Sequence, residues 1–137
     1  MWISAKTDYA CRALIELSLN WPNSTPLQLQ QIAENQKVPV KFLTHILIHL
    51  KQLGYVESVR GKSGGYRLIK PPKDIRLSDL LGGLEGRENS SARGQADILK
   101  DVWAEVETAV TEGISRIDFE NIVNRYRNKT KAIMFEI

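Results

Sequence analysis

The sequence predicts a mainly α-helical fold with one small β-hairpin: a winged helix-turn-helix followed by a long C-terminal helix. Two observations predict this fold. Two short β-type runs, 55–59 and 66–69, flank a loop rich in glycine and basic residues, which is typical of a hairpin with a basic tip. An amphipathic helical pattern over about 39–53, with proline in its first turn, comes directly before that hairpin.

Three helices are predicted before the hairpin. The first runs from a cap at Thr7 or Asp8 to about Asn20, and the second covers about 28–36. Together with the helix over 39–53, each carries apolar residues at helical spacing, which predicts one shared core. Because only Lys37 and Val38 separate the second helix from the third, these two form a helix-turn-helix.

Several shorter features follow the hairpin. Two prolines at 71 and 72 end it, because proline donates no ladder hydrogen bond. A short helix then runs from 77 or 78 to about 84, broken by glycines 82, 83 and 86, and helices over about 96–113 and 118–123 come later. We therefore expect three parts: a DNA-binding winged helix-turn-helix domain over 1–84, a flexible loop over 85–97, and a dimerisation helix with its tail over 98–137.

The helix over 96–113 carries an apolar stripe along one face. Its members are Leu99, Val102, Trp103, Val106 and Val110. A stripe this apolar, outside a small domain that already has a core, predicts a partner helix. The simplest partner is the same helix of a second copy, since two-fold dimers dominate among soluble homo-oligomers. The alternative is that the stripe packs on the chain's own first helix.

Charge and composition narrow the class of function. The chain has 137 residues and a net charge of +3, but positions 37–76 hold nine basic and two acidic residues, a net of +7 that leaves −4 elsewhere. A basic segment of this kind attracts phosphates. No apolar run approaches the roughly 18–20 residues of a membrane span, and the start lacks a signal-peptide layout, so we expect a cytoplasmic protein without membrane contact.

An enzyme is the rival class. His45 and His49, four residues apart, could bind zinc, but no metalloprotease pattern surrounds them and Lys41 and Lys51 flank them. The chain also lacks a P-loop and a dinucleotide-binding fingerprint, so we expect no enzymatic activity. A second rival is a dimeric module that uses its winged helix for protein contacts instead of DNA.

Several segments together carry a family resemblance. They are residues 7–14, 32–34, 42–43 and above all 58–68, which reads Ser-Val-Arg-Gly-Lys-Ser-Gly-Gly-Tyr-Arg-Leu. In this order and spacing the chain resembles the Rrf2 family of bacterial winged-helix regulators, which includes the IscR, NsrR and CymR types. The resemblance implies a homodimeric transcription regulator, usually a repressor, that binds a two-fold operator in double-stranded DNA.

The winged-helix docking mode assigns candidate DNA contacts. The exposed start of the helix over 39–53 reaches base edges, and the hairpin tip lies along the backbone or minor groove. Arg60 matches the family's wing arginine, a minor-groove reader. The family commonly has glycine at the turn position held here by Lys37, and we expect positive φ at glycines 61, 64 and 65. The full candidate set is Pro39, Lys41, Thr44, His45, Arg60, Lys62, Ser63, Gly64 and Arg67, with Lys62 and Arg67 assigned to phosphates.

The resemblance also raises the question of a cofactor. Many relatives hold an iron–sulfur cluster with three cysteines in the loop before the long helix, but positions 86–97 contain none and the chain has one cysteine, Cys11. We therefore expect no cofactor and no metal, with atypical cluster ligation as the alternative. Asp8 matches a ligand position of nitric-oxide-sensing members, and its other interpretation is a carboxylate at a helix N-terminus.

Relatives without the cluster cysteines resemble the CymR type, which works with a cysteine synthase. The end of this chain, Phe135-Glu136-Ile137, is similar to the isoleucine tails that serine acetyltransferases insert into that enzyme. A cysteine synthase is therefore a candidate partner. The alternative is that Ile133, Met134, Phe135 and Ile137 pack on the dimer as a closing strand.

Overall fold

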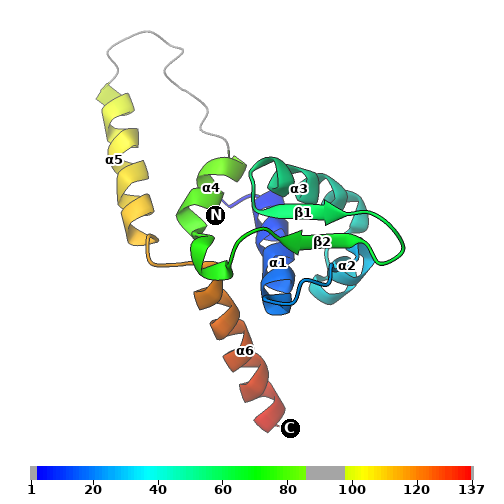
Figure 1. The fold of residues 1–137 in the computed structure, drawn as a ribbon. Helices are drawn as coiled ribbons and strands as arrows, with labels where there is room; N and C mark the ends of the chain where they lie inside the picture. Colours follow the sequence, from blue (N-terminus) through cyan, green and yellow to red (C-terminus); the bar gives the residue numbers. More distant parts are fainter. Residues whose placement is uncertain (1–2, 86–97, 137) are drawn as a thin grey trace.

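The computed structural model describes residues 3–85 and 98–136. The elements are α1 (Ala5–Asn20), α2 (Leu29–Gln36), α3 (Val40–Gln52), β1 (Val56–Val59), β2 (Gly65–Leu68), the 3-10 turn η1 (Pro72–Asp74), α4 (Leu77–Glu85), α5 (Ile98–Gly113) and α6 (Phe119–Glu136). Helices α1–α4 and the hairpin form one body, α5 stands beside α4, and α6 projects from the base of the body (Figure 1). The predicted fold class, mainly helical with one hairpin, is confirmed. The loop predicted after residue 85 lies outside the described residues.

The first three helices share one core, as their spacing predicts. Its fully or almost fully buried side chains come from one face of each helix: Ala10, Ala13, Leu14, Leu17, Ile32, Ala33, Leu43, Ile46, Leu47 and Leu50. The predicted cap of α1 was wrong, because Ser4 precedes the helix and its Oγ accepts from the Thr7 amide at 3.2 Å. Thr7 is buried instead, and its hydroxyl donates to Glu85 at 2.6 Å. This hydrogen bond lowers the pKa of the Glu85 carboxyl and ties the end of α4 to the start of α1.

A polar contact sets how α2 meets α1. Glu16 is 9% exposed and accepts hydrogen bonds from Gln36 at 2.8 Å and from Asn35 at 3.1 Å. Buried polar groups are stable when paired in this way. The residue after α2, Lys37, has φ 54° and ψ 45°, so the turn into α3 uses the left-handed conformation that glycine adopts more readily. That geometry sends the chain back across the core and aims the start of α3 outward.

The hairpin is antiparallel and has a third, very short neighbour. Val56 pairs with Leu68 and Val59 with Gly65, while Leu27 forms an isolated bridge with Tyr66. Positive φ is confirmed at Gly61 (106°) and Gly65 (150°) but was wrong for Gly64, which is buried because its Cα lies against the Val59 carbonyl. A β-carbon at Gly64 would meet that oxygen at 2.1 Å, so close packing is what requires glycine there.

Replacing Gly65 with alanine is expected to destabilise the protein by roughly 3 kcal/mol, because the backbone strain of a side chain at positive φ is added to the cost of a steric clash. The new β-carbon would lie 2.2 Å from the Leu27 carbonyl oxygen. Gly82→Ala is the matched control: its β-carbon meets nothing within 4 Å in α4, and it should stabilise by about 0.5–1 kcal/mol. Urea unfolding followed by circular dichroism measures both, and an unchanged midpoint for Gly65→Ala would refute this account of the bridge.

The C-terminal region departs most from the sequence prediction. Gly82 and Gly83 do not break α4, which continues to Glu85. The predicted short helix over 118–123 was wrong as well: α6 starts at Phe119 and runs for 18 residues, so the tail up to residue 136 is helix and not a closing strand. Buried Phe119 and Val123 anchor its first turns on α1 and η1, and no glycine or proline interrupts it afterwards. Ile137 lies outside the described residues.

In the parts of the chain that the structure describes, no helix combines the length and apolar character required to cross a membrane.

Candidate nucleic-acid interface

The start of α3 presents the predicted base-reading side chains to solvent. Pro39, Lys41 and His45 are exposed, and Thr44 is half-buried. The Thr44 hydroxyl donates to the Val40 carbonyl at 3.1 Å, so its proton is used within α3 and its oxygen can act only as an acceptor for a further partner. The opposite face of α3 is buried in the core, which fixes the orientation of this exposed edge.

An apolar contact that the sequence analysis missed flanks this edge. Phe42 is 47% exposed, its ring centroid lies 6.2 Å from that of Tyr9, and the Lys41 ammonium lies 5.0 Å above it. A cation over an aromatic face is attracted by the ring quadrupole. The pairing of Tyr9 with Phe42 joins α1 to α3 and biases Lys41 toward one side of the helix. Sequence spacing could not reveal it, since the two rings come from different helices.

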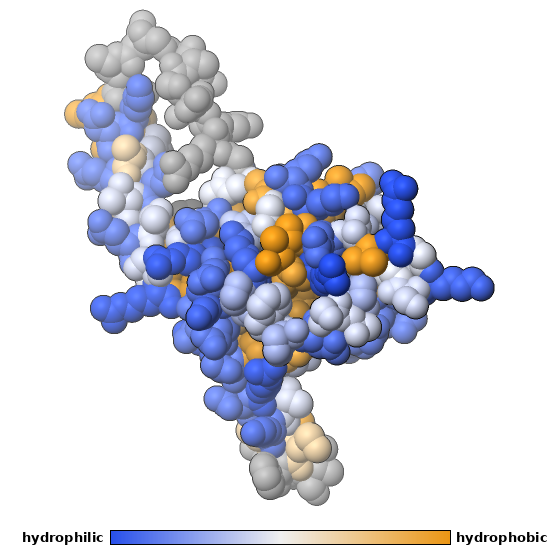
Figure 2. Space-filling model, viewed as in Figure 1, coloured by the Kyte–Doolittle hydropathy of each residue, from blue (hydrophilic) through white to orange (hydrophobic). Residues whose placement is uncertain are grey.

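The hairpin tip carries the other predicted contacts. Arg60, Lys62 and Ser63 are all exposed, and a hydrogen bond of 3.0 Å from the Gly64 amide to the Gly61 carbonyl closes the turn. Hydrophilic side chains project from the edge of the molecule where this loop lies (Figure 2). Among the described residues, Arg60 and Lys62 have no side-chain hydrogen bond or ion pair. Their charged groups are therefore available to a ligand.

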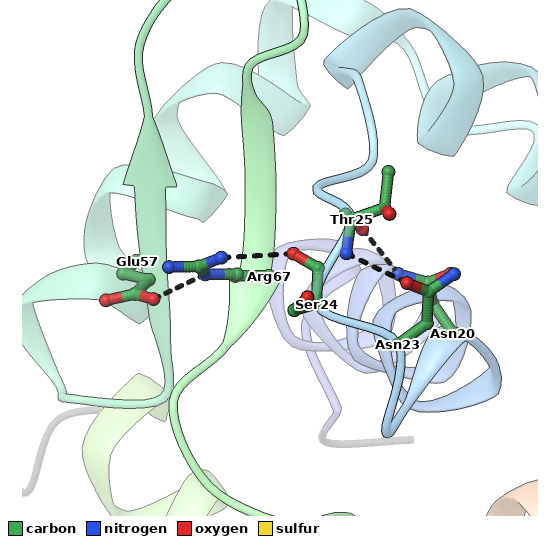
Figure 3. Close-up of polar contacts among 6 residues, drawn as sticks. All are labelled: Asn20, Asn23, Ser24, Thr25, Glu57 and Arg67. Carbon is green, nitrogen blue, oxygen red and sulfur yellow. Dashed lines mark hydrogen bonds and ion pairs between the residues drawn. The ribbon is translucent and has the colours of Figure 1, made fainter.

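Arg67 lies on β2 and has partners within the protein. Its Nε donates to Glu57 at 2.5 Å across the hairpin, and its NH1 donates to the Ser24 carbonyl at 3.0 Å, as Figure 3 shows. The loop it reaches is held by Asn20, whose Nδ2 donates to the Thr25 carbonyl at 2.7 Å. Arg67 thus positions the hairpin against the loop after α1, and only its remaining N–H groups are left for the phosphate contact that we predict.

Two further side chains hold the hairpin, and the sequence analysis missed both. The Lys51 ammonium at the end of α3 donates to Ser58 Oγ at 3.1 Å, and Gln28 Nε2 donates to the Lys62 carbonyl at 3.4 Å. These contacts link the hairpin to α3 and to the start of α2. The N-terminal end of α3 and the hairpin tip therefore keep a fixed relative position, which a two-site contact with DNA requires.

The apolar stripe of α5 lies at the surface. Leu99, Val102, Trp103, Val106 and Val110 are between 36% and 59% exposed, and α5 has no buried residue. With α4 the helix borders a mostly apolar groove of about 570 Å³, to which Ile3, Leu77, Leu81 and Ile114 also contribute. The stripe does not pack on α1 of its own chain, so that alternative is set aside for the described residues.

The histidine pair of α3, His45 and His49, differs in exposure between its two members. His45 is exposed and His49 is half-buried, and burial, with a smaller effect of Lys6, lowers the pKa of the His49 imidazole. Within residues 3–85 and 98–136, no three His, Cys, Asp or Glu side chains gather as metal ligands would.

A helix-turn-helix followed by a basic-tipped hairpin, with both reading elements exposed, defines a winged-helix protein of the DNA-binding class. Comparison with known proteins identifies the family within this class. The family described as "Rrf2: Iron-dependent Transcriptional regulator" matches residues 3–125, so the chain belongs to the Rrf2 family. Proteins of this family that resemble it are transcriptional regulators, which are not enzymes.

Two relatives and two solved structures illustrate the similarity. An rrf2-like regulator of Rhodobacter capsulatus is 41% identical over 86 residues, covering 61% of this chain and 57% of that protein. IscR of Cereibacter sphaeroides is 33% identical over 95 residues, covering 69% and 61%. The solved structure of T. potens IscR shares the fold with a TM-score of 0.75 and 29% identity, covering 92% of this chain and 88% of that one. CymR of B. subtilis, described as a global cysteine regulator, shares it with a TM-score of 0.72 and 26% identity, covering 91% of this chain and 98% of that one. The chain thus spans less than two thirds of the first two relatives.

The donor set of this chain does not fit a cysteine-ligated iron–sulfur cluster. Such clusters are held by several thiolates, and the chain has one cysteine. Cys11 is part-buried in α1, and burial, with a smaller contribution from Asp8, raises the pKa of its thiol to about 11. The Asp8 carboxylate is paired with the Arg12 guanidinium at 2.7 Å. Asp8 is thus already engaged by a partner within α1.

The raised pKa of the Cys11 thiol predicts slow reaction with a disulfide reagent. In the folded protein at pH 8, Cys11 should react with a disulfide reagent about a hundredfold more slowly than in urea, because the thiolate is the nucleophile and its pKa is raised. Absorbance of the released thiolate follows the reaction. Fast labelling of the native protein would show that Cys11 is exposed and activated, contrary to the structure.

Proposed function

We propose that this chain is a sequence-specific transcription regulator, acting as a repressor, that binds a two-fold operator as a homodimer. The observation that carries the proposal is the pair of exposed basic elements: the start of α3 with Lys41 and His45, and the hairpin tip with Arg60 and Lys62. The first matches the width of the major groove, and the second reaches the adjacent backbone or minor groove. Because its proposed target is DNA, the protein would act in the cytoplasm of a bacterial cell.

The exposed stripe of α5 supports the homodimer. Five large apolar side chains on one solvent-facing helix are costly unless a partner covers them. A second copy would cover them with the same stripe, and the two-fold axis would relate the two α3 helices. Helix-turn-helix dimers in general bind half-sites about 10 base pairs apart, centre to centre, or a multiple of that spacing.

Regulation without a cysteine-ligated cluster is part of the proposal, and the missing thiols support it. The protein is expected to purify colourless and to bind its operator in the presence of an iron chelator. Visible absorbance together with stoichiometric iron in a purified sample would contradict this and favour atypical ligation. The cysteine-synthase alternative depends on Ile137, outside the described residues, and stays a prediction.

Selection of bound fragments from genomic DNA, followed by footprinting, tests the function. We expect a protected site with two-fold symmetry, and an affinity that falls steeply with salt because binding releases counterions. Quantitative gel shifts at several salt concentrations measure the slope. A protein that lacks any preferred site, and whose weak binding is the same for all fragments, would instead be a protein-interaction module.

A further inference from the structure

A second cavity lies outside the DNA-facing elements. It measures about 360 Å³ and is bordered by the end of α1, the prolines of η1 and the first turns of α6. This is where α6 leaves the body just below α4 in Figure 1, while the hairpin loop lies at the right-hand edge. Ligand pockets in proteins range from about 300 to 1,000 Å³, so a one- or two-ring molecule fits.

The charges at this cavity are unpaired. Lys73 of η1 and Arg127 of α6 line it, and neither has an ion pair or side-chain hydrogen bond among the described residues. Glu120, about two helical turns before Arg127 in α6, is the acidic group in the lining, which leaves a net charge of +1 from these three side chains. Two cations brought together from elements far apart in the sequence favour an anionic group, and arginine in particular matches a carboxylate.

The remaining lining combines an aromatic surface with polar groups. The half-buried Trp21 supplies a flat apolar face, and Asn124 of α6 supplies an amide. The polar and apolar parts of the lining are about equal, unlike the mostly apolar groove between α4 and α5. A ligand of mixed character, planar and charged at one end, suits this composition.

A buried hydroxyl without a hydrogen-bond partner lies in the wall of the cavity. Ser18 lines the cavity and is 2% exposed, and its Oγ has no hydrogen-bond partner among the described residues. Buried side-chain oxygens are nearly always paired in native proteins. Because the Oγ atom is itself buried, the hydroxyl belongs to the wall of the cavity, and the ligand contacts are left to Lys73, Arg127 and the other lining side chains.

We propose that this cavity binds a small planar organic carboxylate that carries a hydroxyl or amino group. Arg127 and Lys73 hold the carboxylate, the ring lies against Trp21, and Glu120 accepts the ligand's O–H or N–H. A ligand in this cavity would contact both the segment that follows β2 and the start of α6. The site is therefore suited to an effector of the regulator. The binding itself does not depend on the proposed DNA-binding function.

Titration calorimetry on the full-length chain tests the proposal with a matched pair of probes, 3-hydroxy-2-naphthoate and its uncharged amide, 3-hydroxy-2-naphthamide. We expect the carboxylate to bind with a Kd of about 1 mM or lower and the amide at least tenfold more weakly. Arg127→Gln should lower the affinity for the carboxylate about tenfold, whereas Arg125→Gln, the same change on an exposed residue of α6 that does not line the cavity, should leave it unchanged.

No heat of binding with the carboxylate, equal affinity for acid and amide, or full affinity in Arg127→Gln would each overturn the proposal.

Discussion

Replacing Arg60 with alanine is expected to weaken operator binding by about tenfold to a hundredfold, the usual effect of losing an arginine that reads a groove. Arg60 is exposed at the end of β1 and is not engaged by any described side chain, so the change removes a DNA contact without disturbing the hairpin. Binding to unrelated DNA should fall much less, which reduces the ratio between specific and non-specific affinity. Gel shifts with the selected operator and with a scrambled fragment measure both.

Two further variants test whether the loss of operator binding is specific to Arg60. Arg116→Ala removes the same charge between α5 and α6, at an exposed site away from the hairpin, and should change operator affinity little. Lys62→Ala should weaken binding to all sequences about equally and make the salt slope shallower by about 1, as expected of a phosphate contact. Wild-type operator affinity in Arg60→Ala would refute the wing assignment.

Introducing glutamate at Val106 is expected to convert the proposed dimer into monomers. Val106 lies near the middle of the exposed stripe of α5 and is 36% exposed in the single chain, so the chain should still fold. Two-fold symmetry would place a buried carboxylate from each protomer in the same apolar interface. The cost of burying unpaired charges predicts at least a hundredfold weaker dimer, or about 3 kcal/mol or more.

Light scattering after size-exclusion chromatography measures the mass, and circular dichroism checks the helical content. The matched control is Thr108→Glu, which adds the same charge on the opposite face of α5, where the Thr108 hydroxyl only bonds the Ala104 carbonyl of its own helix. The control should remain a dimer. Operator affinity should fall with the mass in Val106→Glu, because each monomer then holds one half-site. A dimeric Val106→Glu protein would place the interface elsewhere.

Local patterns were enough to predict much of this protein. Helices α1 to α3 and the hairpin lie within a few residues of their predicted bounds, because apolar spacing and glycine-rich turns act over short distances. Lys37, at the turn position where the family commonly has glycine, adopts the left-handed conformation that glycine favours. The predictions failed where glycine was interpreted from propensity alone: Gly82 and Gly83 lie within α4, since tertiary packing outweighs a small helix penalty.

The segment after residue 118 is a second place where local sequence patterns failed to predict the structure. The predicted helix ended at 123 and a closing strand was the alternative for the last residues, but buried Phe119 and Val123 anchor the start of a helix that continues to Glu136. Once the first turns are fixed, each further residue adds a hydrogen bond at low cost. The sequence contained one usable signal, the absence of glycine and proline over this whole range.

By itself, the sequence determined the class of this protein: the helix-turn-helix, the basic hairpin tip, the exposed stripe of α5 and the single cysteine are all visible in contiguous or periodic residues. Only the tertiary structure decided which charged groups are already paired. Arg67 is engaged by Glu57 and the Ser24 carbonyl, while Arg60 has no partner within residues 3–85 and 98–136. It also brought Ser18, Lys73 and Arg127 to one cavity. These residues are separated by more than fifty positions, and only the packing of distant elements sets such distances.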